Sequence, residues 1–441
     1  MSAKSVLRRA CEIYLILFAS FHLLFFDFSG YVHIFETKVL SFCLINIPFI
    51  ILTIVMLFLA GRSGSVLNII KRKISLSHIC VFLYFLFTLI SALLSSHFPQ
   101  TVFGVSRFEG LFTTALYCFT FFAVSFIPCR LDKVFTTFCI SVSLLCVVCI
   151  IQFFGFNPFS LYPDGMNFYD AGRLYTTAFA GTIGNTNLLG AFICIALPLI
   201  AVILIKAKTR LRFLLLIPVL LLTITAIKMD VDSTILALII VFINTLPFIM
   251  GFGKKKSIIY FGILLLLGLC LILFIYFYPP SGGMLKEVSE ILHGNISETF
   301  GSGRIRIWKN VISEISDSPV FGKGPDTMLL EEFEPFSRYY PALGKVKTAS
   351  IDVAHNEPLN ILYHQGILGL TAYLGFIIFT LITWWKNKSN TAVLALGVAF
   401  ICYFLQSLFT FSMCLSAPYF WICAGLIVGI SNKSIKEPTL E

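Results

Sequence analysis

The chain has 441 residues, of which 58% are hydrophobic and only 12% are charged. Soluble domains carry about 25% charged residues, so this composition excludes an ordinary soluble protein and indicates one that crosses a membrane several times. The formal charge of +10 comes mainly from short loops beside apolar segments, where it favours contact with membrane lipids rather than with nucleic acid. The absence of a P-loop and of a glycine-rich dinucleotide motif argues against an ATP-driven pump.

Twelve apolar segments are long enough, as helices, to cross the hydrocarbon core. In chain order they are 11–28, 39–60, 76–95, 110–129, 134–154, 184–205, 213–228, 234–250, 257–279, 358–384, 391–411 and 417–431. The first segment lacks a small-residue cleavage site, which favours a retained span over a signal peptide. We therefore expect an all-α polytopic protein with about 12 transmembrane helices, in which residues 1–441 form a single integral membrane domain.

The distribution of Lys and Arg predicts the orientation of these spans. With the N-terminus inside, 20 of the 32 basic residues lie in cytoplasmic segments, and eight of the other 12 lie in one long loop, 280–357. We therefore expect both termini to be cytoplasmic and the loop 280–357, between the ninth and tenth spans, to be extracytoplasmic. The 13 cysteines lie mostly within spans, where a thiol packs as a small apolar group, and no Cys or His spacing is typical of a metal site.

The long loop has a pattern of its own. Apolar and charged residues alternate at helical spacing over 284–292, which predicts a short helix at the membrane interface. A second helix is expected to follow and to end at Pro319; one face of it carries Arg304, Trp308, Val311 and Ile315. A glycine-rich turn at 322–325 then precedes a third predicted helix over 326–333.

Arg304 and Arg306 are the first candidates for chemistry. Two guanidinium groups at the membrane surface suit the binding of a phosphate or diphosphate and stabilise its charge as a bond breaks. Beside Trp308 they equally suit interfacial anchors that bind lipid headgroups. Their spacing alone leaves both interpretations open.

His355, Asn356 and Glu357 come directly before the tenth span, whose first position suits Pro358. The positive end of a helix dipole disfavours imidazolium, so His355 suits a neutral base that takes or aligns the proton of an attacking hydroxyl. Asn356 and Glu357 either orient His355 or cap the helix. A histidine that only caps the helix at the interface is the alternative.

Further polar residues gather on the same predicted face. Arg107 either pairs with Glu109 and lines a headgroup entrance, or caps the fourth span. Arg173 adds a positive charge, and Asn185 and Asn187 suit hydrogen bonds to sugar hydroxyls, although Asn at such a position more often caps a helix.

Two more sites carry ionisable residues. His364 lies inside the tenth span, where function is the default interpretation, but a neutral histidine bonded to a neighbouring helix is favoured. Asp230 and Asp232 suit a cation site, a base or a plain turn.

Taken in order, these features resemble the O-antigen ligase and O-antigen polymerase superfamily. The resemblance extends over roughly residues 100–430 and is most specific in 301–370. It is carried by Gly184-Asn185-Thr186-Asn187-Leu188, Gly303-Arg304 with Trp308, Pro319-Val320-Phe321-Gly322-Lys323-Gly324, His355-Asn356 with Leu359, and Gly366-Ile367-Leu368-Gly369-Leu370. The turn Arg107-Phe108-Glu109-Gly110-Leu111 and the run Gln406-Ser407-Leu408-Phe409 look like those of Gram-positive members.

The resemblance implies a GT-C-type glycosyltransferase of the bacterial cytoplasmic membrane. Such an enzyme takes a glycan from undecaprenyl diphosphate and passes it to a glycan, lipid or protein acceptor on the outer face, with neither a metal nor a nucleotide cofactor. The family's functional arginine maps onto Arg304 and its histidine onto His355, so these two are expected to be catalytic. Substrate binding is expected of Arg306, Asn356, Glu357, Arg173, Asn185, Asn187 and Arg107.

Two positions depart from the family pattern. Many members have a Ser-Arg pair at the start of the eighth span, where this chain has Val231-Asp232-Ser233. Either another residue, such as Arg173 or Arg107, supplies the missing charge, or the donor is bound differently. The residue two before Gly366 is usually an acid or a threonine, and here it is His364.

Two other classes of protein compete with this interpretation. A transporter or flippase of lipid-linked saccharide would carry charged residues along several spans and inverted repeats, whereas these spans are nearly free of charge. A non-enzymatic assembly scaffold would tolerate replacement of Arg304 and His355. Polymerase and ligase share a donor and differ only in the acceptor, so the sequence does not separate them.

Overall fold

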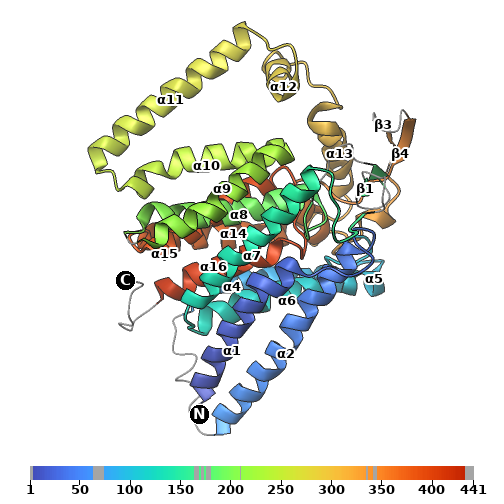
Figure 1. Ribbon diagram of the computed structural model, residues 1–441. Helices are drawn as coiled ribbons and strands as arrows, with labels where there is room; N and C mark the ends of the chain where they lie inside the picture. Colours follow the sequence, from blue (N-terminus) through green and yellow to red (C-terminus); the bar gives the residue numbers. More distant parts are fainter. Residues whose placement is uncertain are drawn as a thin grey trace.

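The computed structural model describes residues 3–62, 74–162, 168–169, 173–174, 180–208, 210–333, 336–340 and 345–432. Helices dominate it (Figure 1). In chain order they are α1 (Ala3–Leu17), the π-helix η1 (Phe18–His22), α2 (Ile34–Arg62), α4 (Leu76–Leu94), α5 (Phe98–Phe103), α6 (Leu111–Phe126), α7 (Asp132–Phe153), α8 (Thr186–Lys206), α9 (Leu211–Met229), α10 (Asp232–Met250), α11 (Lys254–Phe277), α12 (Gly283–Leu292), α13 (Phe300–Ile315), the 3-10 turn η2 (Met328–Leu330), α14 (Glu357–Asn387), α15 (Thr391–Ser407) and α16 (Ala417–Ser431).

Two antiparallel hairpins are added to the helices. One pairs β1 (Phe168–Tyr169) with β2 (Arg173–Leu174), and the other pairs β3 (Phe336–Tyr340) with β4 (Lys345–Ala349). Neither hairpin was predicted from the sequence. The expected all-α class therefore holds for the membrane part, and the long loop between α11 and α14 adds a strand pair.

The helices confirm a multi-pass membrane protein. Within the described residues, the helices that are long and apolar enough to cross a membrane are α2, α4, α7, α8, α9, α10, α11 and α14. Three shorter apolar helices are α6, α15 and α16, and α1 continues directly into η1. Each of the predicted apolar segments thus contains a helix, while the total of twelve spans stays a prediction.

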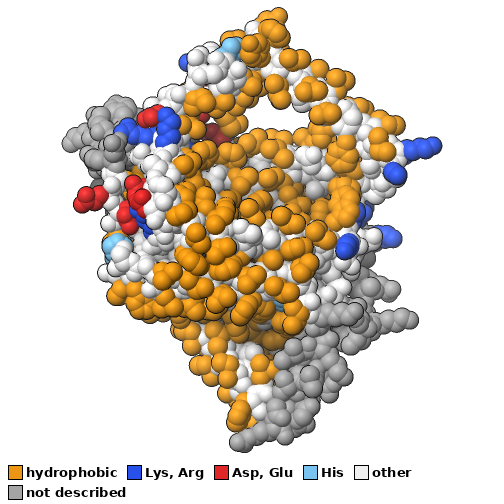
Figure 2. All heavy atoms as spheres, turned by 180° about the vertical axis from the view of Figure 1, so that it is seen from behind, with side chains coloured by type: hydrophobic (Ala, Val, Ile, Leu, Met, Phe, Trp, Pro, Cys, Tyr) orange, Lys and Arg blue, Asp and Glu red, His pale blue; other side chains and the backbone are white. Residues whose placement is uncertain are grey.

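The core of the bundle lies around α8. This helix packs against α9, α10 and α15, while α14 packs against α4 and α16 packs against α6. The outside of the bundle is covered by large apolar side chains (Figure 2). Such a surface is unfavourable in water and suits the hydrocarbon of a bilayer.

One helix, α11, departs from this close packing. Ile275 is its one buried residue, and the ribbon and the space-filling view both show it held away from α10 (Figures 1 and 2). The predicted helix 284–292 is confirmed as α12, which is tied back to α11 where Ser289 Oγ donates to the Ile275 carbonyl at 3.1 Å. The ring of His293 also stacks on Tyr276 with centroids 4.4 Å apart.

Beyond α12, the long loop contains the second predicted helix and lacks the third. α13 becomes regular at Arg304, after three left-handed residues at 301–303, and ends at Ile315, shortly before the Ser318-Pro319 pair that was expected to end it. The helix predicted over 326–333 is wrong, because the chain forms only the short turn η2 there. Asp326 has a φ of 54°, a left-handed conformation that a right-handed helix does not continue.

A break in α14 accommodates the glycine-rich turn. α14 is interrupted at Gly366, where φ is 66°. A Cβ at Gly366 would lie 2.2 Å from the Val320 carbonyl oxygen, and one at Gly322 would lie 2.4 Å from the carbonyl carbon of His364, so the two backbones touch directly. Backbone hydrogen bonds join them from Lys323 to Tyr363 (3.0 Å), from Gly324 to His364 (3.0 Å) and from Ile367 to Pro319 (2.9 Å).

Candidate functional site

The segment 351–357 carries the predicted catalytic histidine. His355 has a left-handed φ of 50°, so the chain turns sharply before α14 begins. Asn356 is the N-cap of α14, and its side chain accepts from the backbone N–H of Leu359 at 2.9 Å. The capping alternative for Asn356 is therefore confirmed, and His355 stands just before the helix as expected.

α13 packs directly against this segment. Trp308 Nε1 donates to the carbonyl oxygen of Ala354 at 2.9 Å. Ala354 is the residue before His355. The predicted face of α13 is confirmed, because Val311 is buried in a small cluster that also contains Ile351 and Ala354. The hydrogen bond and this cluster fix the position of α13, and with it the arginines, relative to His355.

Arg304 and Arg306 lie in the first turn of the regular part of α13. Both side chains are partly buried. Arg304 Nη1 donates to the carbonyl oxygen of Gly301 at 2.9 Å, across the left-handed residues that precede the helix. Both arginines therefore lie at the N-terminal end of the regular part of α13.

Arg107 pairs with Asp352 rather than with Glu109. Its Nη2 lies 2.7 Å from Asp352 Oδ2, and its guanidinium carbon lies 4.1 Å from the centroid of the Phe411 ring. The His355 ring meets the same phenyl ring edge to face at 5.3 Å. The structure therefore brings Arg107 and His355 together on one aromatic ring.

The turn that carries Arg107 is fixed by Asp326. The Asp326 carboxylate accepts from the backbone N–H of Ser106 at 3.1 Å, from Ser106 Oγ at 2.8 Å and from the backbone N–H of Arg107 at 3.0 Å. Gly104 has a φ of 88°, and a Cβ there would also meet this carboxylate, so the backbone conformation and the space both favour glycine. The glycine-rich turn at 322–325 thus places Asp326 where it holds the turn that carries Arg107.

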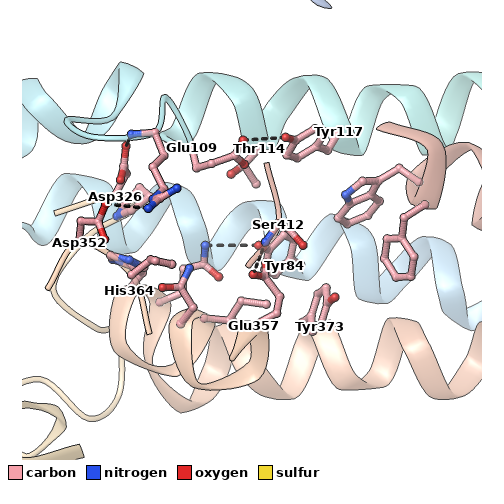
Figure 3. Close-up of a pocket in the computed structure, with 18 residues that line it drawn as sticks. Tyr84, Glu109, Thr114, Tyr117, Asp326, Asp352, Glu357, His364, Tyr373 and Ser412 are labelled. Carbon is pink, nitrogen blue, oxygen red and sulfur yellow. Dashed lines mark hydrogen bonds and ion pairs between the residues drawn. The ribbon is translucent and has the colours of Figure 1, made fainter. Parts of the chain in front are cut away.

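A polar cavity of about 50 Å³ lies beside Arg107. Glu109, from the loop before α6, and Glu357, from the start of α14, point into it from opposite sides (Figure 3). Glu109 accepts from Tyr117 Oη at 2.8 Å and from the backbone N–H of Cys414 at 2.8 Å. The cavity has room for a few water molecules and is too small for a sugar ring.

Burial raises the pKa of Glu109 well above its usual range, because the charged carboxylate is shielded from water. Its hydrogen bond from Tyr117 acts in the opposite direction, and the nearby carboxylates of Glu357 and Asp326 raise the pKa further. The environment of Glu109 therefore favours a protonated carboxyl group.

Lys323 and His364 have partners within the scaffold. Lys323 Nζ lies 2.7 Å from Glu314 and 3.2 Å from Glu331; burial alone lowers the pKa of this lysine, but the hydrogen bonds to these carboxylates outweigh burial and raise it. His364 is buried, and its Nδ1 lies 2.8 Å from the Gly324 carbonyl oxygen. The predicted hydrogen-bonded histidine is confirmed, with the glycine-rich turn as its partner instead of a helix.

The remaining candidates lie at the start of α8 and in β2. Asn185 is the N-cap of α8, and its side chain accepts from the backbone N–H of Asn187 at 3.0 Å. The backbone carbonyl of Asn187 accepts from Gln406 Nε2 at 3.3 Å. Arg173 lies in β2, but its side chain is outside the described part of the chain. Their role in substrate binding stays a prediction.

The comparison with protein families bears on this site. Residues 219–374 match the family model described as O-antigen ligase, over about a third of the chain. This region is therefore similar to the O-antigen ligase family. The resemblance inferred from the motifs is thus confirmed for this region, which supports a membrane protein of polysaccharide biosynthesis. No curated protein matches the chain.

The O-antigen ligase domain supplies only part of the site. It contains α13, the glycine-rich turn, the segment 351–357 and the first half of α14. Arg107 and Glu109 precede it and Phe411 follows it. The ring that joins Arg107 to His355 therefore comes from outside the matched region.

Sequence reasoning missed Asp352 and Phe411, and it noticed Glu109 only as a partner for Arg107. Asp352 stands three residues before His355, and a carboxylate so close to a candidate base was the one available signal. Within the described residues, no group of three or more His, Cys, Asp or Glu side chains lies close enough to hold a metal ion.

Proposed function

We propose that this protein transfers a glycan from undecaprenyl diphosphate to an acceptor hydroxyl at the outer face of the bacterial cytoplasmic membrane. The observation that carries the proposal is the O-antigen ligase match over residues 219–374, which includes Arg304 and His355. The elements around them lie at one end of the helix bundle (Figure 1). We place that end outside and both termini in the cytoplasm, as the distribution of Lys and Arg favours.

In the proposed step, the acceptor oxygen attacks the anomeric carbon of the donor sugar. A new C–O bond forms, the bond from that carbon to the diphosphate oxygen breaks, and undecaprenyl diphosphate leaves with the bonding electrons. His355 takes or aligns the hydroxyl proton. Arg304, helped by Arg306, stabilises the charge on the departing diphosphate.

Arg107 is our candidate for the positive charge that the family motif lacks near Asp232. It shares the Phe411 ring with His355. Its Nε is buried and has no hydrogen-bond partner among the described residues. A buried donor of this kind calls for a ligand or a water, and a phosphate oxygen would satisfy it while Asp352 holds Nη2.

The other polar candidates divide into two groups. Asn356 caps α14 and Glu357 accepts from the backbone N–H of Ser412 at 2.9 Å, so we assign both to the scaffold of the site. Arg173, Asn185 and Asn187 remain candidates for contacts with the glycan.

The test uses purified protein in lipid vesicles with an undecaprenyl-diphosphate oligosaccharide and a host acceptor. We expect wild type to release undecaprenyl diphosphate and His355→Ala to lose this activity by about two orders of magnitude or more, as for loss of a general base. His293→Ala is the matched control, because His293 stacks on Tyr276 near α12 and has no part in the proposed step.

The mass of the product separates the two chemistries. A ladder of products indicates a polymerase, and a single addition to a glycan, lipid or protein indicates a ligase. Absence of release by wild type, with a donor and an acceptor proven in a parallel reaction, would reject glycosyl transfer in favour of a transporter or an assembly scaffold.

A further inference from the structure

The connection between α15 and α16 is unusual for a loop because it is buried. Residues 408–416 have no regular structure, yet Phe411 is 2% exposed and Cys414 is 0% exposed. Loops usually run over the surface, because a buried irregular backbone leaves polar groups without partners. Local turns supply some partners, since the backbone N–H of Ser416 donates to the Met413 carbonyl at 3.0 Å, and further partners come from distant parts of the chain.

Side chains from three distant regions supply those partners. The backbone N–H of Cys414 donates to Glu109 at 2.8 Å, and the backbone N–H of Ser412 donates to Glu357 at 2.9 Å. The carbonyl oxygen of Cys414 also has a side-chain partner, because it lies 2.8 Å from His22 Nε2 at the end of η1. The segment is therefore held from the start of the chain, from the loop before α6 and from the first residue of α14.

This segment reaches the site through Phe411. The phenyl ring lies under the Arg107 guanidinium at 4.1 Å and against the edge of the His355 ring at 5.3 Å. The next buried side chain, Met413, places its sulfur 3.6 Å from Arg107 Nη1. A shift of the 411–414 backbone would move the surface on which both groups rest.

We propose that Glu109 and Glu357 are positioning residues, which fix the 411–414 segment and through Phe411 set the relative placement of Arg107 and His355. The catalytic roles of Arg107 and His355 in this inference rest on the function proposed above. The carboxylates themselves face a cavity of about 50 Å³, which a sugar ring does not fit. Their contacts with backbone N–H groups assign them to the support of the site instead of to the substrate.

A pair of substitutions at Glu109 tests the hydrogen bond itself. In Glu109→Gln the amide oxygen still accepts from Cys414, whereas Glu109→Ala leaves that buried N–H without its acceptor. Amide hydrogen exchange of residues 408–416, measured in detergent, is expected to accelerate at least tenfold in Glu109→Ala and to stay within about threefold of wild type in Glu109→Gln. This readout needs no substrate, so it stands apart from the proposed activity.

A second pair of substitutions tests the ring. Phe411→Leu keeps an apolar side chain but removes the aromatic face, and Phe409→Leu, two residues earlier and 38% exposed, is the matched control. We expect Phe411→Leu and Glu109→Ala to lower the transfer rate about ten- to a hundredfold, the scale of a misplacement of about 1 Å. Glu109→Gln and Phe409→Leu are expected to stay within about threefold of wild type.

The outcomes separate the two proposals. Unchanged exchange at 408–416 in a folded Glu109→Ala protein would overturn the positioning role, whatever the activity. Equal loss of transfer in Glu109→Gln and Glu109→Ala would also overturn it, since the carboxyl group would then act by its proton. Faster exchange together with an inactive wild type would support the positioning of the segment and reject the transfer reaction.

Discussion

Replacing Gly322 with alanine tests the direct backbone contact between the glycine-rich turn and the break in α14. Gly322 has a φ of 71°, and a Cβ there would lie 2.4 Å from the carbonyl carbon of His364 and 2.5 Å from the amide nitrogen of Gln365. The left-handed conformation costs a non-glycine residue about 1–2 kcal/mol. Overpacking against a backbone costs about 1–3 kcal/mol more, so we expect a total loss of about 2–5 kcal/mol.

Gly155 provides the matched control for this prediction. Its φ is 82°, but a Cβ there would meet nothing within 4 Å, so Gly155→Ala is expected to cost only the conformational term of about 1–2 kcal/mol. Unfolding of both variants in detergent, followed by denaturant or heat, measures the difference. Equal losses in the two variants would refute the direct contact between the turn and α14.

Two further predictions concern the site. Trp308→Phe removes the hydrogen bond to the Ala354 carbonyl oxygen. It is expected to lower the free energy of unfolding by about 1 kcal/mol and to slow transfer. Trp385→Phe, on a residue 51% exposed, should change neither, and equal effects of the two would contradict the role of Trp308. The raised pKa of Glu109 means that the folded protein holds this proton more tightly than the unfolded chain, so stability is highest below the ordinary pKa of about 4.5 and falls as pH rises toward the folded value. Thermal midpoints between pH 5 and 8 should therefore decline less steeply in Glu109→Gln than in wild type, and identical slopes would argue against a buried neutral carboxyl.

The membrane helices were predictable because long apolar runs carry their own signal. Each predicted segment contains a helix, although α1 starts near residue 3 instead of 11 and α15 ends at Ser407 instead of 411. The helix 284–292 was also visible, because its alternation of apolar and charged residues is local. Features set by neighbours in sequence were thus predicted well, apart from their ends.

Features set by distant contacts were not predictable. Asp326 takes a left-handed conformation and bonds Ser106, 220 positions away, which is why the helix expected over 326–333 is missing. The pair of Arg107 with Asp352 spans 245 positions. Phe411 was assigned to the end of an apolar span. An apolar sequence pattern does not indicate that this ring contacts both His355 and Arg107.

The sparse packing of α11 has a mechanical consequence. Its 24 residues span about 36 Å at 1.5 Å per residue, enough to cross the hydrocarbon core of about 30 Å with the three lysines at 254–256 left at the interface. Ile275 is the buried residue of this helix, so most of its length faces lipid instead of protein. The far end of α11 carries α12, and Glu287 on α12 accepts from the backbone N–H of Gly301 at 2.9 Å, at the start of α13. The helix that faces lipid is thereby connected, through α12, to the helix that carries Arg304.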